Sequence, residues 1–165
     1  MLKKLAQAEE KWGGESRLID RWLQTRRELL IQYFKLAGLS PRGAAEKSLP
    51  GLQQVHIFCD HMVDYISECH FRIINHIMHS FPEGSAITDR LMPEVLETTD
   101  SLLDFIDTYS NAENDDMLLA LDQDLAQLGD TMETRFALED KLLQTLYTYR
   151  IKRDEASEAV VAANE

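Results

Sequence analysis

The sequence has no run of apolar residues approaching the roughly 18 that a membrane-spanning helix needs. Its first residues, MLKKLAQAEEKW, also lack the apolar centre of a secretory signal peptide, so we expect a cytoplasmic protein. Cysteine is scarce. Cys59 and Cys69 are ten positions apart on one predicted helix, about 15 Å along its axis, which is too far for a disulfide. We expect both to be buried in a reducing compartment.

The sequence motifs of metal, phosphate and nucleophile chemistry are missing as well. No CxxC, HExxH, GxxxxGK[ST] or GxSxG occurs, and no glutamate is followed three positions later by the histidine that a di-iron bundle needs. Cys59 with His56 or His61, three and two positions away, is the only available pairing of a nucleophile with a base, and no third group is placed to orient the base. We therefore expect no enzyme, no metal site and no cofactor.

Basic residues are absent from residues 91–134, where 12 of the 29 acidic residues lie. The remaining 17 acidic residues balance the 17 lysines and arginines, so this segment carries the whole net charge of −12. One interpretation is a solvated surface that keeps the protein soluble. The other is an electric field that attracts a basic protein partner. Direct binding of nucleic acid is disfavoured, because phosphates would be repelled.

A long helix over residues 54–81 is the clearest element in the sequence. Its apolar residues recur at steps of three and four, which predicts one buried helix face; they are Val55, Phe58, Met62, Ile66, Cys69, Ile73 and Ile77. A second face mixes apolar and polar side chains, namely Ile57, Phe71, Ile74 and Met78 with Asp60, Asp64 and Ser67. A helix with two apolar faces is either central in its domain or half of a binding surface.

Similar periodicity elsewhere predicts an all-α fold, an antiparallel bundle of four main helices with a short N-terminal helix. The predicted segments are a short helix in 1–15, a helix over 17–37 capped by Ser16, a loop at 39–51, a helix with Pro93 in its first turn running to about Tyr109, and a helix from Asp116 to about Arg150. Leu96, Leu103 and Ile106 are the expected core stripe of the third helix. Residues 1–150 form one domain in this prediction, and 151–165 a frayed or disordered tail.

Polar residues interrupt the apolar seams at several points. Arg26 lies on the seam of the second helix, and Arg135 and Glu139 lie on that of the last. Two interpretations stay open: an ion network inside the bundle, or a cleft whose polar groups converge on a partner. His70 is expected near the core with a hydrogen-bond partner, and a pH switch is the alternative.

Three blocks of sequence resemble the Rsd/AlgQ family, the regulators of sigma D. They are LIDRWLQTRRELLIQYFKLAG (18–38), FCDHMVDYISECHF (58–71) and METRFALEDKLL (132–143), in which D-R-W, V-D-Y-x-S and R-F-x-L-E-D-K stand out. The resemblance extends over about residues 16–150. Residues 39–52, 82–100 and the tail contribute nothing distinctive.

This resemblance implies a bacterial cytoplasmic anti-sigma factor that binds the promoter-reading C-terminal domain of the primary sigma factor. It would keep sigma from core RNA polymerase as growth slows, as a monomer in the complex, with weak self-association of the free protein left open. The candidate contact residues are Asp64, Ser67, Phe71, Asp20, Trp22, Arg26, Arg135 and Glu139, although for Trp22 the sequence favours a place in the core over a contact. The alternative function is an acidic helical adaptor that regulates a different basic protein.

Overall fold

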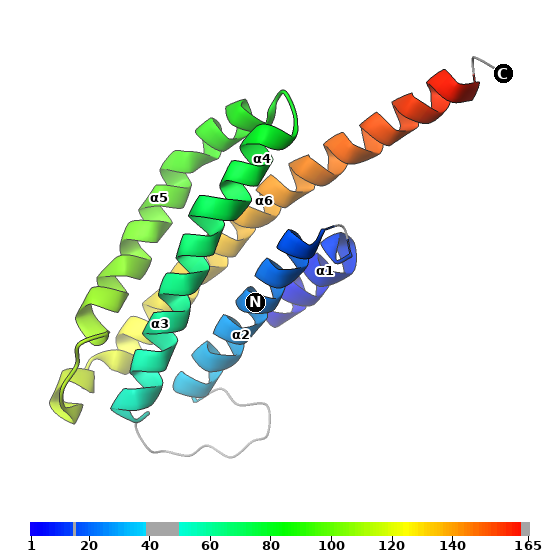
Figure 1. The fold of residues 1–165 in the computed structure, drawn as a ribbon. Helices are drawn as coiled ribbons and strands as arrows, with labels where there is room; N and C mark the ends of the chain where they lie inside the picture. Colours follow the sequence, from blue (N-terminus) through cyan, green and yellow to red (C-terminus); the bar gives the residue numbers. More distant parts are fainter. Residues whose placement is uncertain (15, 39–49, 163–165) are drawn as a thin grey trace.

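The computed structural model describes residues 1–14, 16–38 and 50–162, and every regular element in these ranges is helical (Figure 1). The elements follow in the order α1 (Leu2–Trp12), α2 (Arg17–Leu36), α3 (Leu52–Glu68), the π-helical segment η1 (Cys69–Ile74), α4 (Asn75–Ser80), α5 (Gly84–Tyr109), the 3₁₀ turn η2 (Asp115–Leu118) and α6 (Leu121–Ala162). The all-α prediction is confirmed. Most of the predicted loop at 39–51 lies outside the described residues.

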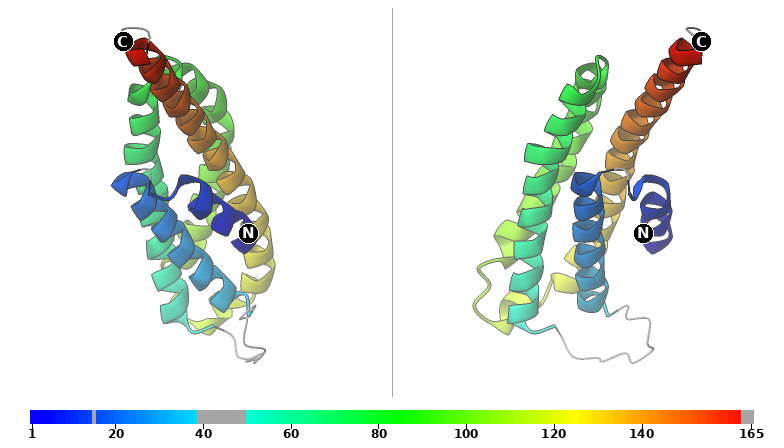
Figure 2. Two further views of the ribbon diagram at one scale, coloured as in Figure 1. Left: turned by 90° about the vertical axis from the view of Figure 1, so that its right-hand side faces the viewer. Right: turned by 45° about the vertical axis from the view of Figure 1, so that its right-hand side comes forward.

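Four antiparallel rods form the bundle: α2, the continuous α3–η1–α4 rod, α5 and α6 (Figures 1 and 2). Around the bundle, α2 packs on α3, α3 on α5, and α5 on α6. Contacts between α2 and α6 close the ring, and the short α1 packs against both of them from outside. The predicted bundle of four main helices with a short N-terminal helix is therefore confirmed. In this ring, the seam between α2 and α3 lies on the opposite side from the seam between α5 and α6.

A close approach of α2 to α6 depends on Gly129. The hydroxyl of Tyr33 reaches across from α2 and donates to the carbonyl of Leu125 at 3.0 Å. A Cβ atom on Gly129 would overlap with this hydroxyl, so any larger residue there would have to displace the Tyr33 side chain. The start of α2 is fixed by Ser16, whose side chain accepts a hydrogen bond from the amide of Ile19 at 3.2 Å, as a serine N-cap does.

The predicted stripe of the central rod is buried along its whole length, from Val55 to Ile77. Within this rod, η1 replaces α-helical by π-helical turns over six residues. Such π segments are inserted turns that are frequent at functional sites. In this segment the residues of the second predicted face differ in exposure: Ile74 is buried, whereas Phe71 is 77% exposed. Cys59 and Cys69 are buried and unbridged, as predicted.

Two predictions about α5 are wrong. The helix begins at Gly84 instead of near Pro93, so Pro93 lies inside it, and Pro93 is exposed where the lost backbone hydrogen bond faces water. Leu96 and Leu103 are exposed, and of the predicted stripe only Ile106 is buried. The buried stripe runs one position earlier, through Val95 and Leu102.

The last helix does not end near Arg150 but continues to Ala162. Its final part extends beyond the other helices of the bundle (Figure 1), and residues 151–157 are exposed. Fraying of this segment stays a prediction. None of the described helices has both the length and the apolar character that crossing a bilayer requires.

Candidate functional site

Arg26 is the centre of an ion network inside the bundle. Its Nη2 lies 3.0 Å from Oε2 of Glu139, and its Nη1 lies 2.7 Å from Oδ1 of Asp140. Its Nε donates to the hydroxyl of Tyr65 at 3.1 Å, and that hydroxyl in turn donates to Glu139. Burial opposes the charge of Arg26, but Tyr65, Glu139 and Asp140 outweigh it and raise the pKa of the guanidinium. Arg26 therefore stays charged and joins three of the four rods.

Arg135 extends the network towards α5. Its Nε lies 2.6 Å from Oε1 of Glu139, so that Glu139 holds both arginines. Its Nη1 donates to the carbonyl of Val95 at 2.8 Å and to the hydroxyl of Thr99 at 2.7 Å. Arg135 and Glu139 have no exposed surface. Charges removed from water in this way must be paired and hydrogen-bonded. Both of these are paired, although Nη2 of Arg135 has no hydrogen-bond partner among the described residues.

Trp22 also lies in the core. It has no exposed surface, and its ring stacks on Tyr65 with centroids 5.8 Å apart. The guanidinium of Arg26 lies between two aromatic rings, 4.7 Å from the centroid of Trp22 and 4.9 Å from that of Phe136. Such cation–π contacts add to the ion pairs. For Trp22, Arg26, Arg135 and Glu139 the structure thus favours the interpretation as core and ion network, because none of them offers surface to a partner.

Asp64, Ser67 and Phe71 come together in a groove on the surface. The groove runs between α2 and the α3–η1 rod, and its volume is about 510 Å³. It is lined by Arg21, Thr25, Glu28, His61, Asp64, Ser67, Glu68, Phe71 and Arg72. We call it the α2/α3 groove. Three of the eight candidate residues are therefore on one accessible surface, and Asp20 is exposed at the start of α2, where it accepts a hydrogen bond from the Gly14 amide at 2.7 Å.

The two carboxylates on the α3 side of this groove differ in their pairing. Glu68 lies 3.1 Å from Arg72 and 3.5 Å from Arg21, so its charge is neutralised within the protein. Asp64 is exposed and takes part in none of the ion pairs formed by the described residues. Phe71 lines the same groove, and its ring is 77% exposed. An unpaired carboxylate and an uncovered aromatic ring in one groove are what a protein-binding surface presents.

Several members of both sites were missed by sequence reasoning. Tyr65 and Asp140 belong to the ion network. Both stand within the quoted motifs V-D-Y-x-S and R-F-x-L-E-D-K, but neither was among the candidate residues. Arg21 and Arg72 belong to the groove, and the spacing of Glu68 and Arg72, four positions apart on one helix, was a usable signal for that pair. Among the described residues, no three His, Cys, Asp or Glu side chains are gathered as ligands for a metal ion.

Comparison with known proteins supports the resemblance noted in the sequence. Residues 1–147 match the family described as the regulator of RNA polymerase sigma(70) subunit, Rsd/AlgQ. A protein named Regulator of sigma D from Enterobacter sp. (strain 638) is 36% identical over 149 residues, covering 87% of this chain and 88% of that protein. Proteins of the same name from Yersinia pseudotuberculosis serotype O:1b (strain IP 31758) and Yersinia enterocolitica serotype O:8 are 35% and 34% identical, each again over 87% of this chain and over 88% and 89% of their own lengths. Since the match spans nearly the whole bundle, the chain belongs to the Rsd/AlgQ family of regulators of the RNA polymerase sigma(70) subunit.

Proposed function

We propose that this protein is an anti-sigma factor that binds the promoter-reading C-terminal domain of the primary sigma factor through the α2/α3 groove. Binding would keep sigma from core RNA polymerase and from promoter DNA, which favours alternative sigma factors as growth slows. Its setting would be the bacterial cytoplasm, and the complex would contain one copy of each protein. Family membership supports a sigma partner and a role as a regulator rather than an enzyme.

The observation that carries this proposal is the pair formed by Asp64 and Phe71. When a partner covers a large aromatic side chain that is 77% exposed, the burial contributes favourably to the free energy of binding. Aromatic residues are frequent energetic centres of interfaces. The unpaired carboxylate of Asp64 supplies a hydrogen-bonding anion in the same groove. The same surface thus offers a partner both an apolar contact and a charged hydrogen-bond acceptor.

The charge of the protein supports the choice of domain. A domain that reads promoter DNA carries arginines and lysines for the phosphates. A protein with a net charge of −12 attracts such a surface, and complementary fields accelerate association. The same charge repels DNA, so the protein competes with the promoter for the basic surface of sigma without binding the promoter itself.

The test is a titration of the full chain against the isolated C-terminal domain of the primary sigma factor, at low and moderate salt. We expect one-to-one binding that weakens with salt, and a loss of at least about tenfold in affinity for Asp64→Ala. The matched control is Asp130→Ala, which removes the same charge from an exposed position on α6 outside the groove. This control should change the affinity less than about twofold.

Two outcomes would contradict the proposal in different ways. If Asp64→Ala bound sigma within about twofold of the unchanged protein, with its helix content intact, the docking surface would lie elsewhere. If the unchanged, folded protein bound no sigma domain at either salt concentration, the alternative function would take precedence, an acidic adaptor for a different basic protein.

A further inference from the structure

The face of α5 that points away from the core alternates apolar and acidic side chains. Leu96, Asp100, Leu103 and Asp107 follow at steps of four, three and four, so they lie on one side of the helix, and all four are exposed. Leu96 and Leu103 expose 47% and 40% of their surface. We call this stripe the α5 face. No lysine or arginine occurs anywhere in residues 91–134, so the segment has no cation of its own to pair with these carboxylates.

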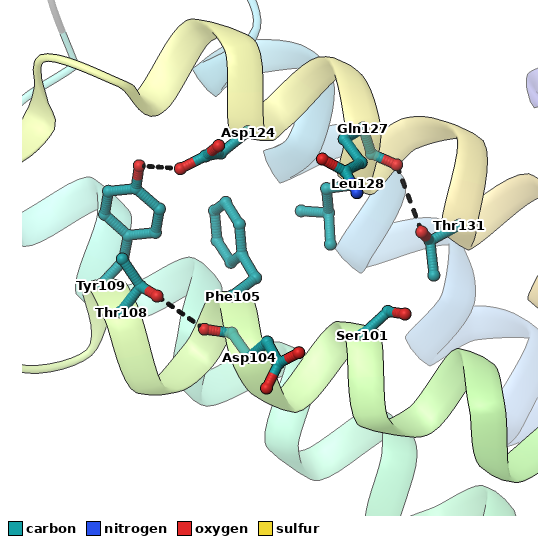
Figure 3. Close-up of a pocket in the computed structure, with 9 residues that line it drawn as sticks. All are labelled: Ser101, Asp104, Phe105, Thr108, Tyr109, Asp124, Gln127, Leu128 and Thr131. Atoms are coloured by element: carbon teal, nitrogen blue, oxygen red, sulfur yellow. Dashed lines mark hydrogen bonds between the residues drawn. The ribbon is translucent and has the colours of Figure 1, made fainter.

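Beside the α5 face, a polar hollow of about 210 Å³ lies between α5 and α6 (Figure 3). Its residues come from both helices and are Ser101, Asp104, Phe105, Thr108, Tyr109, Asp124, Gln127, Leu128 and Thr131. Phe105 and Leu128 are buried and form its apolar floor. Asp104 from α5 and Asp124 from α6 carry the only charges in the lining.

The hydroxyl groups in this hollow have their protons turned away from it. Ser101 donates to the carbonyl of Glu97 at 3.2 Å, Thr108 to that of Asp104 at 2.7 Å, and Thr131 to that of Gln127 at 3.2 Å. The fourth, Tyr109, donates to Oδ2 of Asp124 at 2.5 Å, as Figure 3 shows. Burial raises the pKa of Tyr109, as do the hydrogen bond and charge of Asp124, so the phenol keeps this proton.

The hollow therefore offers lone pairs and carboxylates, with the Gln127 amide as the one donor in its lining. A ligand that fits must supply several donors and positive charge, which describes a lysine ammonium or an arginine guanidinium. The aliphatic stem of either side chain would rest on the apolar floor. At about 210 Å³ the hollow is smaller than the roughly 300–1,000 Å³ of pockets for free small molecules, which favours one inserted side chain.

We propose that the α5 face and the adjoining hollow form a docking surface for a basic amphipathic helix of another protein. One lysine or arginine of that helix enters the hollow between Asp104 and Asp124. Its apolar side chains cover Leu96 and Leu103, and its remaining cations face Asp100 and Asp107. A free diamine would satisfy the hollow and leave the leucines exposed, so the leucines favour a protein segment as the occupant.

This surface is separate from the α2/α3 groove. In the ring of helices the α5/α6 seam lies diagonally opposite the α2/α3 seam, and the linings of the two cavities share no residue. Occupation of one surface leaves the other accessible. The protein would therefore hold two partners at once, and the second docking surface does not depend on the proposed sigma binding.

The test uses a synthetic amphipathic peptide of leucine and lysine at helical spacing, and a scrambled peptide of the same composition as its control. Titration of the ¹⁵N-labelled full chain should shift amide resonances of 96–109 and 121–131, and leave those of 61–72 in place. The scrambled peptide, which has the same charge without an apolar face, should bind at least about tenfold more weakly. Equal binding of the two peptides, or shifts centred on the groove, would overturn the proposal.

A pair of variants isolates the hollow. Asp104→Asn keeps the size of the side chain and removes its charge, and should weaken binding of the amphipathic peptide about tenfold. Asp130→Asn removes the same charge from an exposed site on α6 whose carboxylate acts on Tyr33 of α2, outside the hollow, and should change binding less than about twofold. Equal losses in the two variants would mean that only net charge attracts the peptide. Asp64→Ala should leave peptide binding unchanged, whether or not it affects sigma.

Discussion

The buried ion network and the α2/α3 groove are built from the same kinds of side chains but arranged in opposite ways. Inside the bundle, both oxygens of Glu139 are paired, one with Arg26 and the other with Arg135, and none of the three is exposed by more than 1%. In the groove, Asp64 is exposed and pairs with no cation among the described residues. A satisfied charge fixes the helices, and an unsatisfied one is available to a partner.

Because of this difference, the buried charges contribute to the free energy of unfolding and the exposed charge to the free energy of binding. A buried charge whose partner is removed remains buried and uncompensated, so the loss appears in the stability of the fold. An exposed charge is solvated by water in the free protein, and its removal costs little until a partner has displaced that water. Substitutions in the network should therefore act on unfolding, and substitutions in the groove on binding.

The largest effect on stability is expected for Glu139→Ala. Its removal leaves Arg26 and Arg135 buried beside each other without their shared carboxylate, which should lower the free energy of unfolding by about 3–5 kcal/mol. Urea unfolding followed by circular dichroism measures this. The control is Glu133→Ala on the same helix, where the carboxylate is exposed and, among the described residues, forms an ion pair only with Lys4. No measurable change is expected there. Equal stability of the two variants would remove the distinction between network and surface.

Phe71→Ala should produce the reverse pattern. The ring is 77% exposed, so its loss should leave the free energy of unfolding almost unchanged. Affinity for the C-terminal domain of sigma should fall by about 2 kcal/mol, or roughly 30-fold, as for an aromatic centre of an interface. Leu119→Ala is the matched control, because Leu119 is 79% exposed and lies outside the groove. A loss of stability without a loss of binding would place Phe71 in the fold rather than in the interface.

How far the sequence could predict this division depends on the residue. The seam positions of Arg26, Arg135 and Glu139 were visible from helical spacing. The pairing of Arg26 with Glu139 and Asp140 was not, because it joins α2 to α6 across more than a hundred residues. Arg135 and Glu139 are four positions apart on one helix, so their pairing was open to prediction from spacing. Asp64 and Phe71 stand on a mixed face of the central rod, and spacing alone gave no reason why Ile74 should be buried there and Phe71 exposed. Both residues lie in the π-helical segment, whose turns depart from the α-helical spacing on which the prediction rested.

The errors in α5 have a similar origin. Leu96 and Leu103 are spaced seven apart, and so are Val95 and Leu102, so two adjacent stripes satisfied the same helical pattern. Packing on α3 and α6 selects one of them, and that information is not local. Pro93 was assigned to a first turn because proline disrupts helix interiors, yet nine residues of helix precede it. Apolar periodicity correctly predicted that this segment is helical. It did not predict where the helix begins or which of its two stripes is buried.

A smaller effect on stability is expected for Tyr65→Phe. The substitution removes one hydroxyl, which accepts from Arg26 and donates to Glu139, and keeps the ring stacked on Trp22. The free energy of unfolding should fall by about 1–2 kcal/mol, since two buried charged groups each lose one partner and retain others. Tyr149→Phe is the control, because that ring stacks on Phe81 and its hydroxyl makes no hydrogen bond with the described residues. A loss as large as that of Glu139→Ala would show that the hydroxyl, rather than the carboxylate, holds the network together.

The smallest effect concerns His70, which connects the network to the edge of the groove. Its Nε2 lies 3.0 Å from the hydroxyl of Thr99, which also accepts from Arg135, and Phe71 is its neighbour in η1. Burial lowers the pKa of His70 from its usual 6.5, and the charge of Arg135 lowers it further against the opposing charge of Glu139. The folded protein thus favours the neutral imidazole.

It follows that the unfolded chain takes up the proton first as the pH falls. The contribution of His70 to stability is fully present above about pH 6.5 and is lost as the pH falls from there through the lower pKa of the folded state. Urea unfolding between pH 8 and pH 5 should show this decline, and His70→Gln, which keeps a hydrogen-bonding side chain without a titrating group, should make it shallower. An identical pH profile for the variant would mean that protonation of His70 is not coupled to folding. The network would then be insulated from the groove, and the alternative of a pH switch at this position would lose its physical basis.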